Sequence, residues 1–232
     1  MKHKGKATTA GFKMILWTFV AVAVVWAVGA FIVASAAVIA TVALALTPFL
    51  FVFWVLFAFF TLYFFRDPTP RVPAGTNLVV SPAHAKVDAI ERVTEPEFMH
   101  GDCQRISMFL SVLDVHVQNA PVTGKLSFMK YTTGQFLNAL KAESAQHNEN
   151  VLLGFDAADP KGKQVAVRLI AGVLARRIIP YIKEGDEVVR GDRISLIQFG
   201  SRADVYLPLS ARIQVKLGDK LVGGESVLAS FE

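Results

Sequence analysis

Charged residues are missing from one long stretch of this sequence: between Met14 and Phe65 there is no Asp, Glu, Lys, Arg or His. The stretch is 52 residues long, and as a single helix it would extend about 78 Å. The hydrocarbon core of a bilayer is only about 30 Å thick and one span needs about 20 residues, so two spans fit and one does not. We place them near 15–37 and 44–65, joined by a short apolar turn. Thr47-Pro48 is expected to start or kink the second span.

Acidic residues are also absent from residues 1–13, which precede this stretch and contain four lysines. On the other side, Arg66 and Arg71 follow the stretch. Positive flanks stay on the cytoplasmic side, so both chain ends are expected in the cytoplasm. A cleaved signal peptide is the alternative, but secretory apolar regions run only about 7–15 residues. The predicted organisation is a basic N-terminus at 1–13, a two-span hairpin at 14–65 and a soluble domain at 66–232.

Cysteine is nearly absent, since Cys103 is the only one. An internal disulfide is therefore excluded, which suits a reducing compartment, and a lone cysteine is usually a small buried hydrophobe. Cys103 and the five histidines lack the close spacing of metal ligands, so no metal site is predicted. The basic residues are dispersed, so a nucleic-acid partner is not expected; the net charge of +5 suits anionic lipid headgroups instead.

Short β-type runs dominate the chain after residue 66. They are bounded by Gly, Pro and Asp, as strands are, and they lie at 78–81, 105–112, 165–170, 194–198, 205–207 and 213–217. Three prolines make 66–73 a stiff, extended exit from the membrane. The stretch 133–145 places apolar residues at helical spacing behind a Thr cap and is predicted to be the main soluble helix.

A weak internal repeat lies near the C-terminus, where 185–192 and 218–225 share the pattern Gly-Asp-x-apolar-x-x-Gly-acidic. Each copy predicts a tight turn, a short strand and a second turn. Two such units favour a β sandwich like that of biotinyl and lipoyl carrier domains. Those carriers present a Lys between methionines, which is missing here, so a carrier role is disfavoured. The predicted fold is mainly β, of α+β type, preceded by two transmembrane helices.

Gly200 and Ser201 stand between two predicted strands, where most Gly-Ser pairs form only a turn. The surrounding motifs change that interpretation. They are FFRDP at 64–68, SPA at 81–83, FLSVLDVHV at 109–117, ARRI at 175–178, GDRI at 191–194 and FGSRADVYLP at 199–208. In this order, from Phe64 to the C-terminus, the sequence closely resembles the phosphatidylserine decarboxylase family, in its short, membrane-anchored bacterial branch.

The resemblance implies a self-processing catalytic domain at the cytoplasmic face of a bacterial cytoplasmic (inner) membrane. Ser201 is expected to attack the carbonyl of Gly200, the chain to be cut between them, and residue 201 to become a covalent pyruvoyl group. That group is the only cofactor implied; it forms a Schiff base with the amine of phosphatidylserine, and CO₂ and phosphatidylethanolamine follow. The expected partners are phosphatidylserine in the membrane and the two cleaved chains of the protein itself. A homo-oligomer is left open.

His116 is the candidate residue for proton transfer and self-cleavage, because an imidazole acts as acid or base near neutral pH. Asp114, expected two residues away on the same strand face, either orients that base or ends a strand. One departure stands out: the family usually has Asp after Ser-Pro-Ala, and here His84 takes that place. Asp88 or Asp114 is the candidate for the missing carboxylate.

Two rival functions remain from the sequence. One is an enzyme that acts on another serine-headed lipid. The other is a non-catalytic, membrane-tethered β domain that has lost processing; His84 favours it and the intact Gly200-Ser201 pair opposes it.

Overall fold

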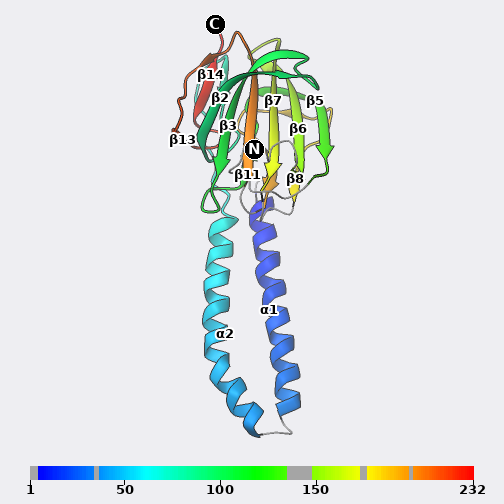
Figure 1. Cartoon of the computed structure of the whole chain (residues 1–232), viewed down its shortest axis with the longest axis vertical. Helices are drawn as coiled ribbons and strands as arrows, with labels where there is room; N and C mark the ends of the chain where they lie inside the picture. Colours follow the sequence, from blue (N-terminus) through cyan, green and yellow to red (C-terminus); the bar gives the residue numbers. More distant parts are fainter. Residues whose placement is uncertain (1–4, 34–36, 135–147, 173–176, 199–200) are drawn as a thin grey trace. The chain divides into compact units, whose positions relative to one another are not determined.

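The structure is a computed structural model, and it describes residues 5–33, 37–134, 148–172, 177–198 and 201–232. The chain divides into two compact units, Gly5–Arg66 and Asp67–Glu232. The first is helical and the second is built from strands (Figure 1).

The helical unit is a hairpin of α1 (Lys6–Val33) and α2 (Ala37–Phe64). Both helices are long and apolar enough to cross a membrane, with a mean hydropathy of 2.4 in each. They lie side by side (Figure 1): the indole Nε1 of Trp26 donates to Thr47 Oγ1 over 3.1 Å, and the rings of Phe19 and Trp54 meet edge to face at 5.4 Å.

One expected boundary of this hairpin was wrong, and one of the two alternatives for Thr47-Pro48 is excluded. α1 begins at Lys6, well before position 15, because lysine side chains can keep their ammonium groups in water while the helix continues. Pro48 lies inside α2 rather than in its first turn. The hydroxyl of the adjacent Thr47 donates to Ala43 O over 2.8 Å, and such side-chain contacts let apolar helices accommodate an internal proline.

The second unit contains one large antiparallel sheet and two small ones. The large sheet has eight strands in the order β13-β2-β3-β11-β7-β6-β5-β9, and the small sheets have the orders β1-β14-β12 and β4-β10-β8. The strands are β1 (Leu78–Val80), β2 (Ala85–Glu95), β3 (Gly101–Leu110), β4 (Val117–Asn119), β5 (Thr123–Thr132), β6 (Asn150–Asp159), β7 (Lys163–Ala171), β8 (Ile178–Pro180), β9 (Glu187–Val188), β10 (Arg193–Ile197), β11 (Ser201–Pro208), β12 (Arg212–Ile213), β13 (Lys220–Leu221) and β14 (Val227–Ser230).

The mainly β fold behind two apolar helices is confirmed. The predicted strands correspond to β1, β3, β7, β10, β11 and β12, but 105–112 runs past the end of β3 and 213–217 continues beyond β12. The long strands β2, β5 and β6 were not predicted. The helix predicted at 133–145 falls almost wholly outside the described residues; Thr133 and Gly134 are not helical.

The repeat forms two nearly identical turns at opposite edges of the large sheet. In the first copy Lys183 N donates to Asp186 Oδ2 over 3.0 Å, and in the second Lys216 N donates to Asp219 Oδ2 over 2.9 Å. Each turn leads into a two-residue strand: β9 pairs with β5, and β13 pairs with β2. The predicted turn and short strand are therefore present in both copies.

One face of the large sheet carries the main core, and we call it the inner face. On β11 it presents Ala203, Val205 and Leu207, which pack with residues of β6, β7 and the small sheets, including Ile178 and Ile197. The outer face carries a smaller cluster that includes Tyr206 and Cys103. Alternation along the strand therefore puts Ser201 on the inner face and Arg202 on the outer face.

Candidate active site

Ser201 is the first residue of β11, a strand in the interior of the large sheet with β3 and β7 as neighbours. It pairs with Leu110 on one side and Ala171 on the other. Its side chain is 0% exposed, and its hydroxyl has no hydrogen-bond partner among the residues that the structure describes. A buried hydroxyl without a partner is costly, so such a group needs an explanation beyond packing. Gly200 lies outside the described residues.

His116 is held near the start of β11 from two sides. Along the chain it follows Leu110, the ladder partner of Ser201, by six residues. Across the small sheet its carbonyl accepts a hydrogen bond from Ile197 N over 3.1 Å, and Ile197 precedes Ser201 by four residues. The side chain of His116 is fully buried. The fold thus brings the two main predicted site residues to the same end of the large sheet.

Asp114 contacts His116 through its backbone rather than its carboxylate. The residue lies in a turn, not on a strand as expected, because its Oδ2 accepts the N–H of Ser111 over 2.8 Å and closes that turn. Its carbonyl oxygen lies 2.9 Å from Nδ1 of His116. Since a carbonyl can only accept, Nδ1 carries the hydrogen, and Nε2 is the basic nitrogen of the neutral ring.

His84 is half-buried just before β2, and its Nδ1 accepts the N–H of Gly223 over 3.2 Å. Nδ1 of His84 therefore carries no hydrogen in this contact, which agrees with the expectation that a neutral His84 could accept a hydrogen bond. The position of Gly223 is tight, since a Cβ there would lie 2.9 Å from Asn119 Oδ1 and 3.0 Å from His84 Nδ1. His84 thus helps to hold a backbone turn of the C-terminal segment.

Comparisons with known proteins give the family of the chain. A family model described as phosphatidylserine decarboxylase matches residues 57–229. The chain belongs to the phosphatidylserine decarboxylase family. Two curated relatives are named phosphatidylserine decarboxylase proenzyme. One, from Desulfotalea psychrophila, is 39% identical over 169 residues, which are 73% of this chain and 78% of the relative. The other, from Gluconobacter oxydans, is 43% identical over 172 residues, which are 73% of this chain and 76% of the relative.

The predicted membership of the phosphatidylserine decarboxylase family, and the prediction that the chain is an enzyme, are confirmed. The match begins inside α2 and continues through the whole large sheet, so it includes every described residue of the candidate site. The word proenzyme in the names of the relatives refers to a precursor of an active enzyme.

An ion pair joins the residue after Ser201 to β2. The guanidinium of Arg202 binds Asp88 through two contacts, Nη1 to Oδ2 at 2.8 Å and Nη2 to Oδ1 at 2.9 Å. Its Nε also donates to Asp204 over 3.3 Å. Burial raises the pKa of the Asp204 carboxyl, and the charge of Arg202 acts in the opposite direction. Asp88, a candidate for the missing carboxylate, is therefore bound to Arg202 on the outer face.

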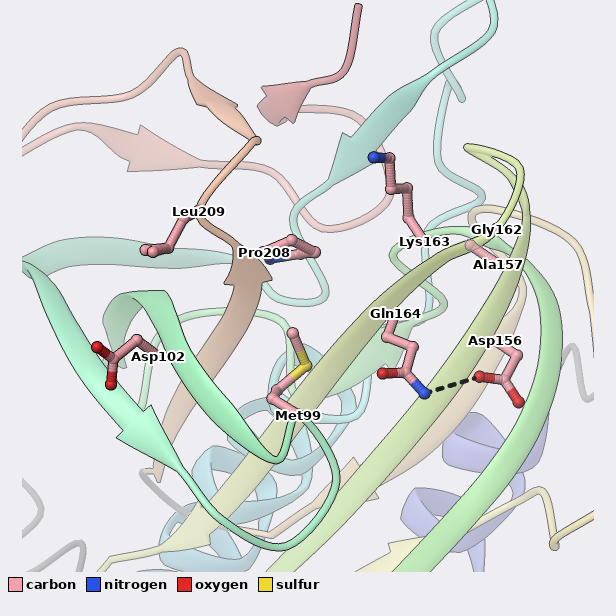
Figure 2. Close-up of a pocket in the computed structure, with 9 residues that line it drawn as sticks. All are labelled: Met99, Asp102, Asp156, Ala157, Gly162, Lys163, Gln164, Pro208 and Leu209. Carbon is pink, nitrogen blue, oxygen red and sulfur yellow. Dashed lines mark hydrogen bonds between the residues drawn. The ribbon is translucent and has the colours of Figure 1, made fainter.

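Neither Cys103 nor the pocket beside Pro208 belongs to this site. Cys103 is fully buried, and burial followed by the charge of Glu95 raises the pKa of its thiol, which opposes a role as nucleophile. The pocket has a volume of about 690 Å³ and lies at the far end of β11 (Figure 2). Pro208, which lines the pocket, is seven residues from Ser201 along β11, or about 23 Å at about 3.3 Å per residue.

Sequence reasoning missed two charged residues at this end of the sheet. Arg202 was quoted only as part of a motif, and Glu149 was not considered. The three polar residues Asn148, Glu149 and Asn150 directly precede the apolar run of β6, yet all three are at most 7% exposed. A polar cluster next to an apolar strand was the available indication.

Proposed function

We propose that this chain decarboxylates phosphatidylserine to phosphatidylethanolamine and CO₂, after it has cut itself between Gly200 and Ser201. The observation that carries the proposal is the buried hydroxyl of Ser201, which stands without a described partner at the start of a central strand. The names of the relatives give the substrate and the precursor state.

Self-cleavage requires a nucleophile and a group that moves protons. The hydroxyl oxygen of Ser201 attacks the carbonyl carbon of Gly200, and the peptide nitrogen leaves as an amine, so that an ester replaces the peptide bond. Loss of the Cα proton of residue 201 then expels the carboxylate of Gly200. The resulting enamine loses ammonia to water, which leaves a ketone at residue 201. Nε2 of His116 is the proposed proton acceptor, because the carbonyl of Asp114 fixes the hydrogen on Nδ1.

The pyruvoyl group, once formed, supplies a carbonyl that binds the substrate amine and takes up electrons as CO₂ departs. The residues of this chain bind, orient and protonate around it. Nε2 of His116, once it has taken up a proton, is the proposed donor to the carbon from which CO₂ has left. The burial of Ser201 and His116 excludes water, which would otherwise protonate or hydrolyse intermediates.

Both products of self-cleavage remain in one folded unit in this proposal. The C-terminal product spans 201–232 and contains β11, β12, β13 and β14. β11 pairs with β3 and β7, β13 pairs with β2, and β14 pairs with β1, all of which belong to the N-terminal product. These ladders and the Arg202–Asp88 pair cross the boundary between the two products.

The apolar hairpin fits a substrate that stays in the bilayer. Basic residues at the N-terminal end of the hairpin and directly after it support a cytoplasmic location of the soluble domain at the inner membrane. No metal or diffusible cofactor enters the proposal.

The central test is Ser201→Ala. Ala has no hydroxyl to attack Gly200, so intact mass should give one chain near 25.3 kDa, against two chains for the wild type, and no decarboxylase activity. The matched control is Ser210→Ala, because Ser210 is an exposed serine of the same C-terminal product; this variant should cut normally. Ser201→Thr keeps the hydroxyl but adds a methyl group at the carbon that undergoes elimination, so slow cutting is expected. An uncut but active Ser201→Ala would overturn the enzyme mechanism, and an uncut wild type would favour the non-catalytic alternative.

A further inference from the structure

Three residues form a row across the inner face of the large sheet. Ser201 of β11 pairs with Ala171 of β7, and Ala171 N donates to Glu149 O over 2.9 Å. Val151 and Leu153 belong to the main core. Because side chains alternate along a strand, Glu149 lies on the same inner face as these two residues. Two strand spacings separate Ser201 from Glu149, which places their Cα atoms about 10 Å apart.

A second row lies on the facing small sheet. Ile197 N donates to His116 O on one side, and Ile197 pairs with Ile178 on the other. The carboxylate of Glu149 reaches this second row, since its Oε1 accepts Ile178 N over 3.4 Å. Strand pairing therefore links the start of β11 to Glu149 through Ala171, and links Glu149 to His116 through Ile178 and Ile197.

The backbone around Glu149 is fixed by neighbouring amides. Asn148 Nδ2 donates to Ala171 O over 2.7 Å, and Asn150 Nδ2 donates to Asn148 O over 2.9 Å. The side chain of Glu149 is only 7% exposed, and its single described backbone contact is long for a hydrogen bond. Burial and then a hydrogen bond with Glu149 raise the pKa of Tyr131. The Glu149 carboxylate is thus buried, where carboxylates are rare unless they have a cationic or donor partner, and its described partners are the uncharged Ile178 N and the Tyr131 side chain.

We propose that Glu149 binds the ammonium group of the serine headgroup and accepts a proton from it, so that the amine can attack the carbonyl at residue 201. This inference rests on the proposed function. Amino groups of this type are mostly protonated near neutral pH and are then not nucleophilic. Attraction between an ammonium and a carboxylate is much stronger in a buried site than in water.

The proton balance closes without any other reactant. Glu149 takes one proton from the ammonium, and the free amine forms a bond to the carbonyl carbon at residue 201. The proton on Glu149 then goes to the hydroxyl that leaves as water. The sum is ammonium plus ketone giving protonated imine plus water, and Glu149 is a carboxylate again. His116 keeps its two proposed roles, in self-cleavage and in protonation of the carbon from which CO₂ has left.

The test compares Glu149→Gln with Glu95→Gln in the full-length protein in detergent. Gln keeps an acceptor oxygen for Ile178 N, so Glu149→Gln should fold and cut. Glu95 is the matched control, a carboxylate 2% exposed that accepts the N–H groups of Phe98 and Met99 at the other end of the sheet. Intact mass reports cutting, and phenylhydrazine, whose amine is unprotonated near neutral pH, reports the carbonyl at residue 201 without needing a base.

The decisive readout is the rate at which borohydride traps short-chain phosphatidylserine on the 32-residue C-terminal product. At pH 7 we expect Glu149→Gln to trap the lipid about 100-fold more slowly than wild type, with a rate that rises steeply with pH as free amine becomes available. Phenylhydrazine should label both variants normally, and Glu149→Asp should recover part of the trapping rate.

The possible failures can be told apart. Wild-type trapping and an unchanged pH profile in Glu149→Gln would overturn this inference and leave the proposed function intact. An uncut Glu149→Gln would also overturn it, because Glu149 would then serve self-cleavage. A wild type that cuts but does not react with phenylhydrazine would overturn the proposed pyruvoyl chemistry itself.

Discussion

At His116, a backbone carbonyl makes the contact for which the carboxylate of Asp114 was one candidate. The contact from Nδ1 to Asp114 O fixes which nitrogen is basic, and the Asp114 carboxylate secures the turn that presents this carbonyl. Carbonyls and carboxylates can both fix a histidine tautomer, but only a carboxylate adds a full charge. Sequence identifies residue types, whereas the backbone orientation of a turn appears only in three dimensions.

His116→Gln should stop or greatly slow self-cleavage. The amide of Gln can still donate to Asp114 O, but it offers no basic nitrogen, so the cleavage rate should fall by about 10²–10⁴-fold. The measurement is a time course of intact mass after synthesis of the precursor. His100→Gln is the matched control, because His100 also contacts a backbone carbonyl, Pro96 O at 3.0 Å, but is exposed and lies at the far end of β2 and β3. Normal cutting by His116→Gln would remove His116 from the proposal.

His84→Asp should keep the fold and cut at least as fast as wild type. A carboxylate can accept the Gly223 N–H that Nδ1 of His84 now accepts. His84→Ala removes the acceptor and leaves a buried N–H unpaired, which should lower the free energy of unfolding by about 1–3 kcal/mol. Thermal melts and intact mass of the two variants check this. If His84→Asp abolishes cutting, the imidazole has a role of its own.

At the scale of elements, sequence predicted β10 and missed the partly exposed β2 and β5; it also missed β6, although most of that strand is buried. β10 is buried along its whole length and was predicted almost to the residue. β2 is interrupted by Lys86, Asp88, Glu91 and Arg92, and its exposure follows no clean alternation because a bulge shifts its register against β3. β5 has two such shifts against β6. Bulges break the period of two on which strand prediction depends.

Only part of the candidate site could be predicted from the sequence. Motifs identified Ser201 and His116, but Glu149 and Asp88 owe their positions to pairing across the sheets. β6 lies two strands from β11, although more than 40 residues separate them in the chain. Pairings at such separation leave no periodic pattern in a single sequence, so the row from Ser201 to Glu149 could be found only from the strand order.

At the scale of the whole molecule, the charge distribution supports one proposed arrangement of the two apolar helices in a membrane. The described spans have no acidic residue, and the basic residues of α1 stand near its start, at Lys6 and Lys13. Positive residues resist translocation. Basic residues precede most of α1 and follow α2. A hairpin with both ends in the cytoplasm therefore keeps both basic segments on the cytoplasmic side.

Single cysteines at positions 3, 35 and 232 test this topology. A membrane-impermeant maleimide added to intact spheroplasts should label position 35, in the connection between α1 and α2, and should not label position 3 or position 232. Lysis should make the latter two reactive. Cys103 serves as an internal control: it is 0% exposed, and burial raises the pKa of its thiol, so it should react only after denaturation. Labelling of position 3 or 232 from outside before lysis would contradict the hairpin, because the hairpin keeps both of these positions in the cytoplasm.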